Sequence, residues 1–159
     1  MKKWVLSKHD SAAMAEKLES SLSLDLGEAG SSQARCEEPK DGVVFAHFDE
    51  LLFVQTGEEF VPFLGSPETV SLFPSVTVDE GAIKYLLNGA DVMRPGVKSF
   101  EPWGGEGRTV VVREEKKGRA IAIGRSLVAS DRMQEMSKGA CLKNLHHVGD
   151  EYWNLYKTV

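Results

Sequence analysis

The sequence lacks the features that mark membrane, secreted and disulfide-bonded proteins. No apolar run approaches the roughly 18 residues of a membrane-spanning helix, and the apolar part of residues 1–7 is too short for a secretory signal. The chain has 2 cysteines, Cys36 and Cys141, which lie far apart and form no CxxC pair. We therefore expect a soluble cytoplasmic protein with buried free thiols rather than a disulfide framework.

Common catalytic and cofactor-binding motifs are also missing. The sequence contains no GxSxG elbow, Walker-type loop, HExxH pair or cysteine cluster. The glycine-rich segment 104–107 lacks the strand-to-helix setting of a phosphate-binding loop. His146 and His147 are adjacent on a predicted strand, where successive side chains point to opposite faces and cannot readily share one ion. The sequence predicts a protein that is not an enzyme and has no metal and no cofactor.

The net charge of −5 is unevenly distributed along the chain. Residues 1–75 carry 6 Lys/Arg and 13 Asp/Glu, whereas residues 76–159 carry 13 and 11. This weakly basic second half cannot bind nucleic acid through overall charge alone, so an RNA site there must be a local patch. The acidic first half is suited to a basic partner surface.

Residues 1–74 predict an α+β domain. Ser7 is a suitable N-cap for a helix that ends near Leu22. Between residues 34 and 63, short apolar runs separated by turn residues predict a small sheet, with Gly57 at a hairpin position that needs positive φ. The helix is expected to place Ala13, Met14, Leu18 and Leu22 on its apolar face.

Residues 75–159 predict a mainly β domain. A strand over 75–78 precedes a helix over 80–87, which Asp79 caps and Gly89 ends. Many short strands in about 80 residues favour a small barrel, because closure removes exposed edges. The remaining elements are a strand over 90–94, a loop over 98–108, a hairpin of 109–113 and 120–124, a short helix after Ser130, and final strands over 141–148 and 152–156.

Two stretches of the second half resemble a known family. Residues 78–84 (VDEGAIK) and 88–97 (NGADVMRPGV) look like the signature of the PUA domain, named for pseudouridine synthases and archaeosine transglycosylases. Residues 138–139, 144–146 and Trp153 are similar to the malignant T-cell amplified sequence proteins and their translation-machinery-associated relatives. The resemblance implies a pre-PUA α+β domain followed by a mainly-β PUA-type pseudo-barrel of six strands with two short helices.

The resemblance also implies an RNA-binding groove between the helix 80–87 and the strand that follows it. Glycine at position 89 would let backbone approach the sugar-phosphate chain. Arg94 is the strongest candidate for a phosphate or base contact, because its planar guanidinium can bond bidentately. By residue-by-residue transfer, the groove would contain Gly89, Ala90, Asp91, Val92, Met93 and Arg94, with Lys84 above it and Arg125 and Lys143 as secondary contacts.

Several of these residues have an equally good structural interpretation. Residues 89–90 can simply cap a helix, and one of Val92 and Met93 must be core because side chains alternate along a strand. The basic turn 114–119 contains two glutamates and is typical of a solvated surface. Trp103 could stack on a base or plug the barrel end, and its setting favours plugging.

The sequence as a whole favours a non-catalytic adaptor that binds structured RNA, either tRNA or rRNA. The expected setting is translation initiation or recycling at the small ribosomal subunit, with the acidic first domain contacting a protein partner and with no DNA or membrane partner. Three alternatives stay open: a ribosome-biogenesis factor, an RNA-binding subunit of an RNA-modification enzyme of the pseudouridine synthase or transglycosylase type, and a protein-interaction module without RNA affinity.

Overall fold

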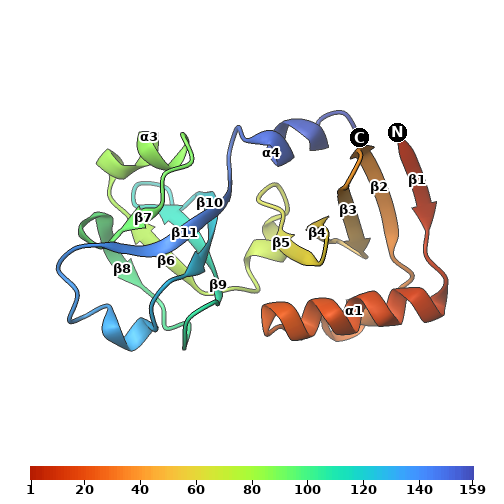
Figure 1. Ribbon diagram of the computed structural model, residues 1–159, viewed down its shortest axis with the longest axis horizontal. Coiled ribbons are helices and arrows are strands. Elements are labelled where there is room, and N and C mark those ends of the chain that lie inside the picture. The colour runs from red at the N-terminus through yellow and green to blue at the C-terminus, as the bar shows by residue number, and fades with distance from the viewer. The chain divides into compact units, whose positions relative to one another are not determined.

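The computed structural model describes all residues from 1 to 159, which form two units (Figure 1). The first unit comprises Met1–Leu72 together with Glu151–Val159, and the second comprises Phe73–Asp150. Residues 151–159, which the sequence assigns to the second domain, therefore belong to the first unit. None of the helices has the length and apolar character needed to cross a lipid bilayer.

A five-stranded antiparallel sheet forms the centre of the first unit. The strands follow one another in sequence order, because each connection is a hairpin or, after β1, a helical excursion. Gly57 has φ +60° at the first position of the turn between β4 and β5, as a type II′ hairpin turn requires. This predicted hairpin is confirmed. The strands are β1 (Lys2–Val5), β2 (Arg35–Lys40), β3 (Val43–Phe48), β4 (Leu51–Thr56) and β5 (Glu59–Pro62).

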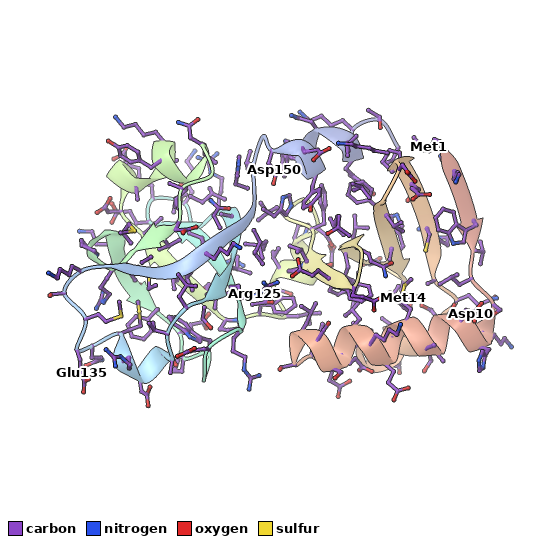
Figure 2. All side chains as sticks on the ribbon, in the orientation of Figure 1. Met1, Asp10, Met14, Arg125, Glu135 and Asp150 are labelled. Carbon is purple, nitrogen blue, oxygen red and sulfur yellow. The ribbon has the colours of Figure 1, made fainter.

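The predicted first helix is confirmed as α1 (Lys8–Leu22), followed by the 3₁₀ turn η1 (Gly27–Ser31). The Ser7 hydroxyl accepts a hydrogen bond from the Asp10 backbone N–H at 3.0 Å at the start of the helix, where Figure 2 labels Asp10. Its buried face differs from the prediction, because Ala13 is exposed and Ser11 is buried. The Ser11 hydroxyl accepts from the Ala34 N–H at 2.9 Å, so a polar contact replaces an apolar one. The buried residues are Ser11, Ala15, Leu18 and Leu22.

The strand predicted over residues 152–156 is wrong, because this segment forms the helix α4 (Glu151–Tyr156). The Tyr156 ring lies 5.0 Å from Phe45 and 4.7 Å from Phe63, and Trp153 stacks on Phe63 at 6.0 Å. Helical spacing brings these aromatic side chains onto one apolar face of the sheet, whereas a strand would divide them between two faces. In Figure 1, α1 and α4 lie on opposite sides of the strands of this unit. The first unit also contains the short helix α2 (Pro67–Val70).

The second unit is built on a curled six-stranded sheet with the order β7-β11-β10-β9-β6-β8. Its one parallel pair joins β6 and β9. The sheet encloses an apolar core that includes Trp103, whose indole N–H donates to the Val128 carbonyl at 3.0 Å, so the predicted burial of this residue is confirmed. The strands are β6 (Ser75–Val78), β7 (Val92–Met93), β8 (Val97–Phe100), β9 (Thr109–Glu114), β10 (Ala120–Ser126) and β11 (Ala140–His147), with a 3₁₀ turn η4 (Ser130–Arg132) before β11.

The connection between β6 and β7 contains the predicted capped helix in shortened form. Asp79 Oδ1 accepts from the Ala82 N–H at 3.1 Å at the start of the 3₁₀ turn η2 (Glu80–Ala82), and α3 (Ile83–Leu86) follows. Gly89 then has φ +91°, the left-handed conformation expected after a helix end. After β7, a further 3₁₀ turn, η3 (Arg94–Gly96), leads into β8, a strand within a segment that the sequence predicts as a loop.

Candidate nucleic-acid interface

A groove of about 410 Å³ runs between α3 and the segment formed by β7 and η3. Its floor is apolar, because it is formed by the core residues Val78, Leu86 and Val92, each at most 2% exposed. Tyr85 and Met93 line it with 58% and 50% of their surfaces exposed. An apolar floor edged by an aromatic ring and a thioether can receive a stacked nucleobase. The other lining residues are Asp79, Gly81, Ala82, Ala90, Asp91, Pro95 and Gly96.

The loop between α3 and β7 is held in place by Asn144 of β11. The Asn144 amide nitrogen donates to the carbonyls of Leu86 at 3.0 Å and Ala90 at 2.9 Å. Its backbone N–H donates to Asp91 Oδ1 at 2.9 Å. Three hydrogen bonds from one residue therefore fix the backbone that forms this side of the groove. Sequence reasoning missed this role, because the partners of Asn144 lie more than 50 positions away along the chain.

Gly89 is required by its backbone angle rather than by a close approach of other atoms. A Cβ added there would lie 3.8 Å from His147 Nε2, an ordinary van der Waals distance. The φ of +91° is the feature that disfavours other residues. The backbone angle of Gly89 is the one expected of a residue that ends a helix. A contact between Gly89 and RNA stays a prediction.

Arg94 is turned away from the groove and ties two segments of the second unit together. Its Nε donates to the Met133 carbonyl at 2.7 Å, and its Nη1 donates to the Val97 carbonyl at 3.3 Å. Arg94 is half-buried and does not line the groove. Two of the guanidinium nitrogens are already engaged with backbone, so the structure gives this residue a stabilising role that the sequence did not predict.

The remaining predicted residues divide between the groove and the neighbouring sheet. Val92 is buried in the core and Met93 is exposed, so Val92 is the core member of this alternating pair. The Lys84 ammonium lies 5.1 Å from the centre of the Tyr85 ring, so a cation accompanies the aromatic residue at the groove. Arg125 (Figure 2) and Lys143 lie opposite each other on β10 and β11, and neither lines the groove.

The basic turn between β9 and β10 is closer to this site than its sequence suggests. Lys116 Nζ forms an ion pair with Glu80 Oε1 at 3.0 Å, and the Glu80 N–H donates to Glu115 Oε1 at 3.2 Å. The turn is therefore fastened to η2, directly before the helix that borders the groove. Lysine side chains of this turn are thus additional candidates for phosphate contacts.

Glu114 is a buried carboxylate that organises the same turn. It accepts from the Lys117 backbone N–H at 2.5 Å and from the Arg119 N–H at 3.4 Å. The pKa of Glu114 is lowered from its ordinary value of 4.5, mainly because the hydrogen bond from the Lys117 N–H stabilises the ionised carboxylate.

We expect Glu114→Gln to change the pH dependence of folding. A carboxyl group whose pKa is lower in the folded than in the unfolded state stabilises the folded state at pH values above its unfolded-state pKa. This contribution is lost as the pH falls through the lower, folded-state pKa. The variant should therefore be less stable than the natural chain at neutral pH and should lose less stability on acidification. Urea unfolding at about pH 7 and about pH 4 measures this difference. Parallel pH profiles would contradict it, and the exposed Glu106→Gln is the matched control.

The two adjacent histidines have separate partners. The His146 ring is fully buried and its Nδ1 lies 2.8 Å from Asp150 Oδ2, whereas His147 Nδ1 lies 2.9 Å from the Val148 carbonyl. No group of three or more His, Cys, Asp or Glu side chains is arranged to hold a metal ion. Each ring is thus bonded to a residue close to it in the sequence near the end of β11.

Comparison with known proteins identifies relatives of this chain. The PUA domain family model matches residues 74–148. Translation machinery-associated protein 20 of Eremothecium gossypii is 37% identical over 121 residues, covering 70% of this chain and 65% of its own length. Malignant T-cell-amplified sequence 1-B of Xenopus laevis is 30% identical over 126 residues, covering 76% of this chain and 68% of its own.

The same resemblance extends to solved structures. A hypothetical protein of the archaeon Pyrococcus horikoshii OT3 is 28% identical and superimposes with a TM-score of 0.77, covering 97% of this chain and 99% of that protein.

Two translation machinery-associated proteins are matched over 65% and 62% of their lengths, so the matched region spans less than two thirds of these relatives.

Proposed function

This chain belongs to the PUA-domain family of malignant T-cell-amplified sequence and translation machinery-associated proteins, and on that premise we propose that it is a non-catalytic RNA-binding adaptor of the translation apparatus. Its ligand is structured RNA, either tRNA or rRNA, and its place of action is the small ribosomal subunit during initiation or recycling. The names of the relatives support the setting, and the groove beside α3 supports the binding.

The groove beside α3 is the observation that carries this proposal. It combines an apolar floor, an exposed ring at Tyr85, a lysine beside that ring and a loop whose backbone is fixed by Asn144. Stacking and backbone contacts of this kind bind RNA without a strongly basic surface, which agrees with the weak positive charge of the second half. Lys84 and the turn 114–119 supply the phosphate contacts.

The ionisable groups of the groove support binding rather than chemistry. Asp79 Oδ1 is committed to the cap at the start of η2, and Asp91 Oδ1 accepts the Asn144 N–H. Both carboxylates are thus engaged in hydrogen bonds that hold the backbone around the groove in place. The acidic first unit is suited to a basic partner surface on the ribosome or on an associated protein.

We expect Tyr85→Ala to weaken RNA binding by about five- to thirtyfold, because loss of one stacked base costs about 1–2 kcal/mol. The measurement is fluorescence anisotropy with labelled tRNA and with a small-subunit rRNA fragment, repeated over a series of salt concentrations. Leu127→Ala is the matched control, since Leu127 is also an exposed hydrophobic residue of the second unit. Equal losses in both variants would remove the groove from the binding site.

Sedimentation of cell extracts tests the proposed setting. Comigration with mature small subunits supports a role in translation. Comigration with pre-ribosomal particles would instead indicate a biogenesis factor, and copurification with a synthase or transglycosylase would indicate a modification subunit.

A further inference from the structure

β1 is an open edge of the sheet in the first unit. It pairs with β2 on one side only, and all four of its residues are exposed. In Figure 1 it is the outermost strand of this sheet. The opposite edge strand is different, because Phe60, Val61 and Pro62 of β5 are buried and Pro62 has no N–H to offer. An exposed edge of this kind is a template for a further strand.

The register determines which backbone groups of β1 face outward. Trp4 pairs with Cys36, and the Leu6 N–H donates to the Ala34 carbonyl at 2.9 Å. Even-numbered residues therefore direct their N–H and C=O groups toward β2. In an antiparallel ladder the alternate residues, Lys3 and Val5, direct theirs away from it. These two residues offer two donors and two acceptors to an incoming strand.

The side chains at this edge are unusually apolar for an exposed surface. Met1, Trp4 and Val5 are 60%, 37% and 60% exposed, and they make up three of the seven large hydrophobic side chains that are exposed in the whole chain. Figure 2 labels Met1 beside the start of β1. A partner strand would cover this apolar surface as well as satisfy the backbone.

The same edge carries exposed positive side chains within an acidic unit, although the buried Glu37 lies opposite Lys3 on β2. Lys3 and Arg35 lie on one face of the sheet beside Val5, and neither forms an ion pair or a side-chain hydrogen bond. The nearby Glu37 carboxylate is buried and is bonded to His47 Nε2 at 2.6 and 2.7 Å. These residues line a shallow concavity of about 270 Å³.

We propose that β1 is the docking edge for an extended acidic peptide of a partner protein, which adds to the sheet as a further strand. Main-chain hydrogen bonds to Lys3 and Val5 hold the peptide, and its acidic side chains meet Lys3 and Arg35. A second copy of this chain fits less well, because pairing two β1 strands would bring four lysines into one ladder. This surface is separate from the RNA groove and does not depend on it.

The test uses the full chain and two synthetic probes, an acetylated peptide of alternating Glu and Val and a matched peptide of alternating Lys and Val. The acidic peptide should bind at least about tenfold more tightly. In ¹⁵N-labelled protein it should shift the amide signals of Lys3 and Val5. Equal affinity for the two peptides, no detectable binding, or concentration-dependent dimerisation that buries β1 would each overturn the proposal.

Two variants probe the contacts separately. Val5→Pro removes an outward N–H without breaking a β1–β2 hydrogen bond, and Lys3→Glu reverses one charge. Each should weaken acidic-peptide binding by about three- to tenfold, the effect of one hydrogen bond or one charge pair. Lys8→Glu, an exposed lysine outside β1, is the control and should change affinity little. If Val5→Pro disturbs the fold, Lys3→Glu still decides the question.

Discussion

Ala90→Phe should lower RNA affinity by about a hundredfold, the largest functional effect expected of a single substitution in this chain. Ala90 lines the groove and is exposed, so a phenyl ring there would fill the space in which we place a nucleobase. The loss corresponds to about 2–3 kcal/mol, the contribution of one or two stacked bases. Anisotropy titration at fixed salt measures it.

The fold should tolerate this change. Ala90 is exposed, and its hydrogen bonds to Asn144 and Tyr85 are made by backbone atoms that the substitution keeps. Ala12→Phe on α1 is the matched control, because Ala12 is also exposed and lies in the first unit. RNA affinity that survives Ala90→Phe would show that RNA binds elsewhere, with Lys143 and the turn 114–119 as the next positions to vary.

Arg94→Ala should have the largest effect on stability, lowering the free energy of unfolding by about 2–4 kcal/mol. The substitution removes the charged donors to Met133 and Val97 and leaves the carbonyl of Met133, a fully buried residue, without this partner. Urea denaturation followed by circular dichroism measures the change. Arg94→Lys should be intermediate, because lysine keeps the charge but cannot form the same two planar contacts.

The same variant separates two roles for Arg94. The sequence predicts a direct RNA contact, whose loss would weaken binding by about 1–3 kcal/mol without unfolding the protein. The hydrogen bonds in the structure predict the reverse: reduced stability, with RNA affinity of the folded fraction changed by less than about threefold. Arg132→Ala, at an exposed arginine of the same unit, controls for the loss of one positive charge.

The sequence predicts the local elements of this fold well, because their signals lie within a few residues. The Ser7 cap, the Gly57 turn and the Asp79 cap are all found where the sequence places them. Of the contiguous motif, Ala90, Asp91, Val92 and Met93 line the groove beside α3, whereas Gly89 and Arg94 do not, and the RNA contacts of all six stay predictions.

Features that depend on distant partners could not be predicted in the same way. Whether Arg94 faces solvent or the Met133 carbonyl is decided by a residue 39 positions away, and the role of Asn144 depends on the loop before β7. Likewise, the segment 152–156 has aromatic residues suited to a strand or a helix. The apolar sheet face formed by Phe45 and Phe63 selects the helix.

The return of α4 to the first unit constrains the order in which the chain can fold during its synthesis. The second unit is one continuous segment, Phe73–Asp150, and can complete its core as soon as that segment has left the ribosome. The first unit begins earlier but finishes later, because the sheet face around Phe45 and Phe63 stays uncovered until residues 151–159 have been made. A nascent chain stalled before that point would leave this aromatic surface exposed to solvent and prone to association with other chains.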